Sequence, residues 1–184
     1  FDGSPADKAG IRRGDIIVSF DGKDLPRLKS DANTLASFIF KMEGMKPGQK
    51  HRLGVLRGDK TVSVEFEAAA YPLEFRESRY AYFKRLGFSV REFVIDDALA
   101  RKMQKPAMDA PVVQFVKPNS PASSAQPNGL GQSEIIREIN SVPVKSYSQA
   151  VEILSKINSD ESAKDLVILS EDYKETKLLR IKLD

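Results

Sequence analysis

The side chains that could support catalysis are few in this sequence. His51 is the only histidine among the 184 residues, and the chain contains no cysteine. No serine lies in a nucleophile-elbow pattern, and no carboxylate stands in an obvious position to orient the His51 imidazole. The lack of cysteine excludes thiolate nucleophiles, disulfides and thiolate zinc sites. We therefore expect no catalytic residue, no metal site and no cofactor in this chain.

Charge and hydropathy argue against two further classes of function. The 29 Lys and Arg residues against 26 Asp and Glu residues leave a net charge of +3, with both signs interspersed. Binding along a nucleic-acid backbone needs a concentrated basic stripe, so we expect no nucleic-acid partner. The longest apolar stretch, near residues 35–40, is much shorter than the roughly 20 residues of a membrane-spanning helix. The chain opens at Phe1 without a signal peptide, so we expect a fragment of a longer protein.

The sequence contains an internal repeat. Residues 4–11 read Ser-Pro-Ala-Asp-Lys-Ala-Gly-Ile, and residues 120–125 read Ser-Pro-Ala-Ser-Ser-Ala. A pair of isoleucines follows each copy, at residues 16–17 and 135–136, where a strand pattern begins. The repeat predicts two related modules.

The same order of elements follows each copy. Ser146 and Gln149 fit a capping box, which predicts a helix through about residue 158. Its apolar stripe is formed by Tyr147, Ala150, Val151, Leu154 and Ile157. The corresponding helix of the first module covers residues 31–42, with Leu35, Phe38, Ile39 and Met42 expected to point inward. Alternating patterns over residues 53–67 and 166–183 predict a hairpin after each helix.

Residues 71–84 interrupt this pattern. We expect them to be a linker between a first module at residues 1–70 and a second module at residues 85–184. The segment is charged around Arg76–Arg79 and then aromatic at Tyr80, Tyr82 and Phe83. A free tether would be less apolar, so we expect the aromatic part to pack on a module.

These motifs resemble those of PDZ domains of the bacterial type. Residues 4–25 follow the family pattern closely, whereas the second copy has Ser133-Glu134 in place of Gly-Asp and Ser141 in place of glycine. Residues 85–90, Arg-Leu-Gly-Phe-Ser-Val, resemble the family's Gly-Leu-Gly-Phe loop and the strand after it. The helix expected over residues 96–103, before a strand at residues 112–116, is similar to one in the PDZ modules of HtrA/Deg-type bacterial serine proteases.

The resemblance implies an α+β fold of two PDZ-like modules. Each would be a small, partly open antiparallel β-barrel or sandwich capped by helices, and the first would lack its N-terminal strands in this chain. The resemblance also implies a parent protein with a trypsin-like protease domain, located in the periplasm or cell envelope and active in protein quality control. The Gly-Asn-Ser-Gly-Gly nucleophile motif of such a domain is absent here, so we expect the chain itself to be non-catalytic.

A PDZ module binds an extended peptide as an added strand, and the resemblance assigns this site to the second module. The backbone amides of Leu86, Gly87 and Phe88 would hold the peptide carboxylate, and Arg85 would add positive potential. The groove would be lined by Ser89 and Val90 of the strand and by Ala150, Val151 and Leu154 of the helix, and would accept a hydrophobic C-terminal side chain. By periodicity alone these apolar residues are also typical of a hydrophobic core.

Three functions remain open from the sequence. The first is a regulatory tandem that recognises C-termini or extended segments of unfolded proteins and passes them to its own protease domain. The second is the PDZ portion of another envelope protease. The third is an architectural role, in which the modules pack together or build a homo-oligomer. A loop filled by the molecule's own atoms, or loop amides that point elsewhere, would count against the peptide-receptor functions and leave only this third one.

Overall fold

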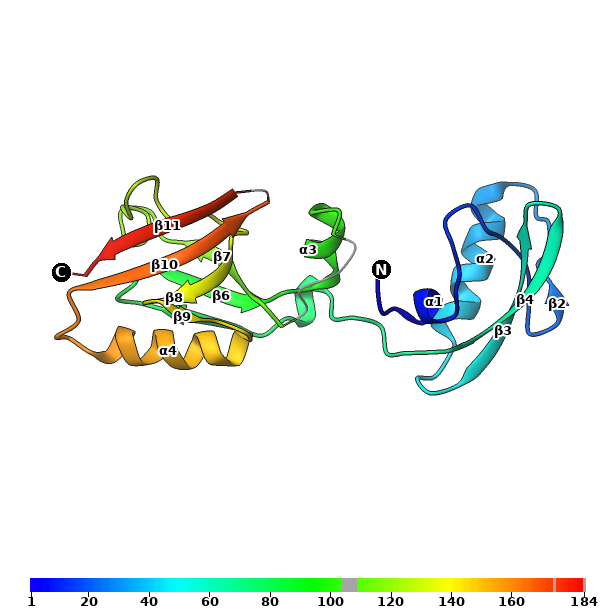
Figure 1. The fold of residues 1–184 in the computed structure, drawn as a ribbon, viewed down its shortest axis with the longest axis horizontal. Coiled ribbons are helices and arrows are strands. Elements are labelled where there is room, and N and C mark those ends of the chain that lie inside the picture. Colours follow the sequence, from blue (N-terminus) through cyan, green and yellow to red (C-terminus); the bar gives the residue numbers. More distant parts are fainter. Residues whose placement is uncertain (104–108, 174, 184) are drawn as a thin grey trace. The chain divides into compact units, whose positions relative to one another are not determined.

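The computed structural model describes residues 1–103, 109–173 and 175–183. It divides into two compact units, Phe1–Tyr71 and Pro72–Asp184. Each unit has one antiparallel β-sheet with helices beside it, as Figure 1 shows, which confirms the expected α+β class. Neither sheet closes into a barrel within the described residues.

The first unit contains a four-stranded sheet in the order β2-β1-β3-β4. Its strands are β1 (Ile16–Phe20), β2 (Lys23–Asp24), β3 (Lys50–Arg57) and β4 (Lys60–Glu67), and its helices are α1 (Pro5–Lys8) and α2 (Asp31–Glu43). The hairpin of β3 and β4 is in register from Lys50 opposite Glu67 to Arg57 opposite Lys60. The alternating apolar residues of this hairpin form the buried core, namely Leu53, Val55, Val64 and Phe66.

Helix α2 begins at the predicted cap but packs less completely than its sequence suggests. The Ser30 hydroxyl accepts the Asn33 N–H at 3.2 Å. Phe38 and Met42 pack against the core, whereas Leu35 and Ile39 are 57% and 45% exposed, so their expected inward position is wrong. Among the described residues, the sheet of this unit is narrower than that of the second unit and offers less surface to cover them.

The second unit contains a seven-stranded sheet in the order β11-β10-β8-β7-β6-β5, with β9 paired to β8. Its strands are β5 (Tyr80–Phe83), β6 (Phe88–Glu92), β7 (Pro111–Val116), β8 (Ile135–Ile139), β9 (Val142–Pro143), β10 (Asp165–Asp172) and β11 (Glu175–Lys182). The helices are η1 (Phe75–Glu77, a 3-10 turn), α3 (Ile95–Ala100) and α4 (Tyr147–Ser159). Helix α4 contacts β5, β6 and β7. The main core lies beneath this helix and includes Ala150 and Leu154.

The internal repeat is visible in the structure. Strands β8, β9, β10 and β11 have the same order and neighbours as β1, β2, β3 and β4, and α4 corresponds to α2. The turn after the first strand is also the same. In one unit the Asp21 carboxylate accepts the Arg52 N–H at 2.8 Å, and in the other the Asn140 side chain accepts the Val167 N–H at 2.8 Å.

The segment expected to be a linker contributes structure to the second unit. Residues 71–84 include η1 and β5, and β5 pairs antiparallel with β6 from Tyr80 opposite Arg91 to Phe83 opposite Phe88. The aromatic part of the segment thus pairs with a module through its backbone, but of its side chains only Phe83 is buried, whereas Tyr80 and Tyr82 are exposed. A four-residue connection, from Lys84 to Gly87, reverses the chain between the two strands.

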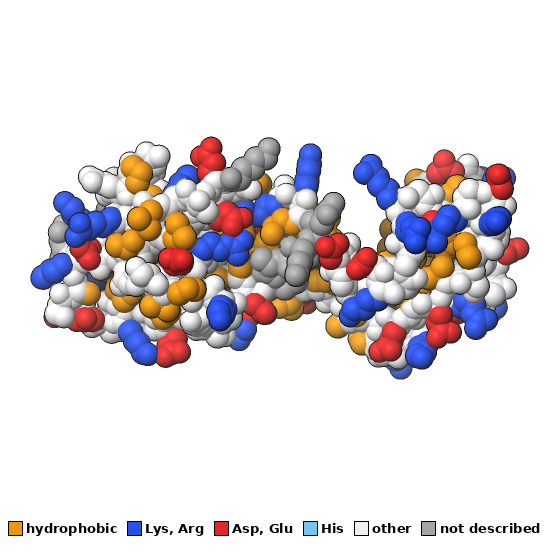
Figure 2. Space-filling model, viewed as in Figure 1, with side chains coloured by type: hydrophobic (Ala, Val, Ile, Leu, Met, Phe, Trp, Pro, Cys, Tyr) orange, Lys and Arg blue, Asp and Glu red, His pale blue; other side chains and the backbone are white. Residues whose placement is uncertain are grey.

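The described helices and the face shown in Figure 2 can be compared with the expectations on membrane and nucleic-acid binding. None of the described helices is long and apolar enough to cross a membrane. Figure 2 shows Lys and Arg side chains interspersed with Asp and Glu on the visible face of each unit.

Asp15 ties the Gly-Asp motif of the first unit to β3. The Arg57 guanidinium donates to both Asp15 carboxylate oxygens, at 2.8 and 2.7 Å, and the Arg12 N–H donates at 2.8 Å. The Asp15 side chain is only 4% exposed. These hydrogen bonds, that of Arg57 first, lower the pKa of Asp15 to about 2.

Gly87 is needed where the chain turns into β6. Its φ of +80° is a conformation that residues with a side chain rarely adopt. A Cβ atom at Gly87 would also lie 2.2 Å from the Ser120 Cβ. Gly58, in the β3–β4 turn, has a φ of +60° and open space where its Cβ would be.

We expect Asp15→Asn to lower the melting temperature of the first unit by several degrees at pH 7. A carboxylate with a depressed folded-state pKa stabilises the fold above its unfolded value near 4, and this stabilisation is lost as the pH falls toward about 2. The difference between wild type and variant should therefore shrink between pH 4 and pH 2. Thermal unfolding followed by NMR signals of the first unit measures it. Asp24→Asn, at an exposed position, should show no such trend; a constant difference for Asp15→Asn would contradict the assignment.

Substituting Gly87→Ala should destabilise the second unit by about 3 kcal/mol, because backbone strain and a steric clash act together. Gly58→Ala is the matched control with backbone strain alone, and should cost the first unit about 1 to 2 kcal/mol. Urea denaturation, with the two units followed separately by NMR, gives both values. Equal losses in the two variants would show that the contact with Ser120 is not restrictive.

Candidate functional site

The residues predicted for the carboxylate loop and groove come together around β6 and α4. Five of them are fully buried in one hydrophobic cluster, and Val151 packs at its edge; the five are Leu86, Phe88, Val90, Ala150 and Leu154. Ser89 is buried too, although its side chain points to the opposite face of β6 from those of Phe88 and Val90. The structure therefore assembles the predicted set, but as part of a closed core.

The edge of β6 that a peptide would use is occupied by β5. Strand β6 pairs with β7 on one side and with β5 on the other, so β5 is the outermost strand. The antiparallel register places Ala81 opposite Val90 and Tyr82 opposite Ser89. Because α4 contacts both β5 and β6, the strand lies in the position between sheet and helix where an added peptide strand would be expected.

The end of β5 meets the predicted carboxylate loop. The Gly87 N–H donates to the Phe83 carbonyl oxygen at 2.8 Å. The Phe83 side chain is 3% exposed, and its ring centroid lies 5.8 Å from that of Phe88. Phe83 of the same chain thus accepts the Gly87 N–H with its carbonyl oxygen and fills the apolar slot with its side chain.

The Arg85 side chain binds the carbonyl groups at the C-terminal end of α4. Its guanidinium donates to the carbonyl oxygens of Asp160 and Ala163, both at 2.6 Å, and to that of Ile157 at 3.2 Å. Its backbone N–H donates to the Asn158 side chain at 2.9 Å. A cation at this position satisfies helix C-terminal carbonyl groups and interacts favourably with the helix dipole.

The other end of β5 is held by a polar contact that we call the Arg79 clasp, formed by Arg79, Glu92 and Tyr147. The Arg79 N–H and Nε donate to the Glu92 carboxylate at 3.0 and 2.9 Å, and the Glu92 N–H donates to the Arg79 carbonyl at 3.1 Å. The guanidinium also lies 5.4 Å from the centre of the Tyr147 ring. The hydrogen bond from the Arg79 side chain lowers the pKa of Glu92, and burial raises the pKa of the Tyr147 hydroxyl.

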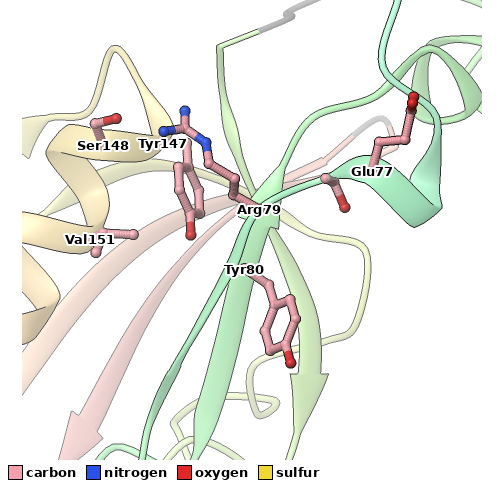
Figure 3. A pocket seen from close by; sticks show the side chains of 7 residues that line it. Glu77, Arg79, Tyr80, Tyr147, Ser148 and Val151 are labelled. Carbon is pink, nitrogen blue, oxygen red and sulfur yellow. The ribbon is translucent and has the colours of Figure 1, made fainter.

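An open cavity lies beside the Arg79 clasp. It has a volume of about 630 Å³ and is lined by residues of α4 and of the segment leading into β5, namely Glu77, Ser78, Arg79, Tyr80, Tyr147, Ser148 and Val151. Figure 3 shows Arg79 extending toward Tyr147 on α4, whereas Tyr80 points away from the helix. The groove between α4 and the sheet thus reaches solvent at this end.

His51 has a carboxylate partner that the sequence pattern did not reveal. Its Nδ1 lies 2.8 Å from an Asp21 carboxylate oxygen, and its ring stacks on Phe20 at 5.2 Å between centroids. Asp21 also accepts the Arg52 N–H, which is the largest cause of its lowered pKa. This pair fastens the turn after β1 to β3.

The residues that sequence reasoning missed are those of the covering strand and its clasp. Phe83, Arg79 and Glu92 were not assigned to the site, and Tyr147 was assigned only to the apolar face of its helix. The alternation of Ala81 and Phe83 with Tyr80 and Tyr82, followed by a short turn, was the available signal for a strand.

Comparison with known proteins finds similarity to a domain family in the first unit and to curated proteins along most of the chain. The family model described as PDZ domain matches residues 2–67. The "Probable periplasmic serine endoprotease DegP-like" of Chlamydia trachomatis is 28% identical over 153 residues, covering 83% of this chain and 28% of that protein. The "Periplasmic serine endoprotease DegP" of Salmonella typhimurium is 29% identical over 151 residues, covering 82% and 27%. The "Periplasmic pH-dependent serine endoprotease DegQ" of Escherichia coli is 28% identical over 153 residues, covering 83% and 30%.

Among solved structures, the HtrA3 PDZ domain bound to a phage-derived ligand matches with a TM-score of 0.40 and 20% sequence identity, covering 58% of this chain and 88% of that chain. The chain spans less than a third of the length of each curated relative named above. The names of those relatives agree with the expected periplasmic location. The first unit is thus similar to PDZ domains, and most of the chain is similar to part of the Deg-type periplasmic serine endoproteases.

Proposed function

We propose that this chain is the regulatory, peptide-binding PDZ region of an HtrA/Deg-type serine protease. In this proposal the second unit receives a guest, meaning an extended segment or C-terminus of another protein, as a strand beside β6 and beneath α4. The regions that the comparisons match carry no catalytic role here, and proteolysis belongs to the protease domain of the parent protein. The guest is held for delivery to that domain or for its activation.

The observation that carries this proposal is the way β5 is bound. An extended strand lies antiparallel to β6, buries a hydrophobic last side chain, and places a carbonyl oxygen 2.8 Å from the Gly87 amide nitrogen. A guest with a C-terminal carboxylate could make the same contacts, with one further oxygen in place of the peptide bond that continues to Lys84. Main-chain pairing would supply affinity, and the slot around Phe88 would select the last residue.

The electrostatics of the loop favour a guest carboxylate held by amide donors. Arg85 is engaged by three carbonyl groups at the end of α4, so its charge lies near the loop while its donors are already used. A desolvated carboxylate needs hydrogen-bond donors to replace water, and amides of a tight turn provide them. The position of Gly87 in this turn is compatible with that role.

An architectural role is the second candidate, and the closed groove favours it. It is also favoured by the apolar side chains that α2 leaves exposed, above all Phe40, which is 77% exposed. Sedimentation equilibrium distinguishes the candidates, because packing between copies through α2 requires self-association that Phe40→Glu abolishes. A monomer at all concentrations would leave this candidate without support.

Binding of a heptapeptide that copies residues 77–83, Glu-Ser-Arg-Tyr-Ala-Tyr-Phe, tests the proposed function. We expect the form with a free C-terminal carboxylate to bind with a dissociation constant on the order of micromolar once the groove is open. Amidation should weaken binding at least about tenfold, because a charge-assisted hydrogen bond is lost. Replacing the final Phe by Asp should weaken it similarly, because the slot is apolar. Fluorescence anisotropy measures all three peptides, and equal affinities would contradict the proposal.

A further inference from the structure

We propose that residues 79–83 are an intramolecular ligand that keeps the peptide groove of the second unit closed, and that a guest binds by displacing them. This inference rests on the proposed function and adds its regulation and its preferred ligand. The preferred guest is an extended chain that ends in a large hydrophobic residue and has a small residue two positions before the end. The β5 strand itself has this pattern, with Phe83 last and Ala81 two positions earlier.

The contacts of β5 fall into an inward and an outward set. Phe83 is buried in the main core and Ala81 packs against that core, whereas Tyr80 and Tyr82 are exposed. Successive side chains of a strand point to opposite faces, so only every second residue of a guest would be read by the groove. Ala81 lies opposite Val90 and packs, partly buried, against the core.

Strand β5 has the features of a segment with low local stability. It is four residues long, lies at the end of the sheet order, and has a strand partner on one side only. Local opening of such edge segments costs less free energy than global unfolding. The β6 strand, in contrast, is paired on both sides and can keep its position through β7 when β5 leaves.

Within the Arg79 clasp, the ion pair of Arg79 and Glu92 holds β5 from outside the hydrophobic core. The Arg79 side chain is 67% exposed and that of Glu92 is 13% exposed, so the pair sits at the solvent end of the groove. Arg79 lines the open cavity between the segment 77–80 and the start of α4. Removing the Arg79 guanidinium frees the Glu92 carboxylate for an arginine of a guest while leaving Phe83 and Ala81 unchanged.

The first test compares Arg79→Ala with intact protein, using the labelled heptapeptide with a free carboxylate. We expect the variant to bind the peptide roughly three- to tenfold more tightly, because its internal ligand is held less firmly. The matched control is Arg180→Ala. Arg180 is an exposed arginine of β11, and its Nε and Nη2 donate to Asp165 on β10, at the opposite end of the sheet order from β5. The affinity of this control variant should equal that of intact protein.

A second test locks β5 in place. The Glu92 N–H donates to the Arg79 carbonyl, so by the alternation of antiparallel pairs Tyr82 and Ser89 form a non-hydrogen-bonded pair. Cysteines at such a pair have closely spaced Cβ atoms and can form a disulfide. The chain has no other cysteine, so Tyr82→Cys with Ser89→Cys in the Arg79→Ala background gives a single possible bridge. Oxidation should abolish peptide binding, and reduction of the same sample should restore it.

The outcomes separate the two levels of the proposal. If intact protein binds the free-carboxylate peptide as tightly as Arg79→Ala, or if the oxidised variant still binds, the internal ligand is refuted while the proposed function stands. If intact protein and the reduced variants all fail to bind up to about 1 mM peptide, the proposed function fails as well. Tighter binding by Arg79→Ala that disappears on oxidation supports both.

Discussion

Backbone groups of a buried strand need hydrogen-bond partners on both sides, and this requirement governs the second unit. Strand β6 carries buried Phe88 and Val90 beneath α4, so its outer edge cannot be left to water without also exposing the apolar slot. An extended chain beside β6 is therefore strongly favoured, and a state without one exposes both the strand edge and the slot. In the present structure β5 provides it, and in the proposed bound state a guest does.

The general fold could be predicted from sequence because its signals are local. The N-cap serines Ser30 and Ser146 each accept the N–H three residues later, at the start of two of the predicted helices. The strand pairs after them follow alternating patterns that need no long-range information. The repeat adds a check, because Asp21 and Asn140 fasten equivalent turns. The inward position of Leu35 and Ile39 could not be predicted, since burial depends on how many strands lie under the helix.

The candidate site was predictable as a set of residues but not as an open or closed state. The sequence positions of Leu86, Val90 and Leu154 fit a buried core and also fit the lining of a peptide groove. Both descriptions apply once Phe83 fills the slot. What decides between them is the partner of the β6 edge, which the residues of the groove do not encode. The role of Arg85 was hidden for a related reason, because its acceptors at the end of α4 come from a distant part of the sequence.

Strand β5 is covalently joined to the groove that it occupies, so it competes with any guest at a high effective concentration. A ligand joined to its site by a short segment has an effective concentration on the order of millimolar or above. If the closed state occupies about 99% of the molecules, the apparent dissociation constant of a guest is about 100-fold weaker than its intrinsic value. The groove then responds only to abundant or tightly bound segments, such as those exposed when many proteins unfold together. The exposed Arg79 side chain, rather than the buried Phe83 slot, is the place where that threshold can be adjusted without loss of the fold.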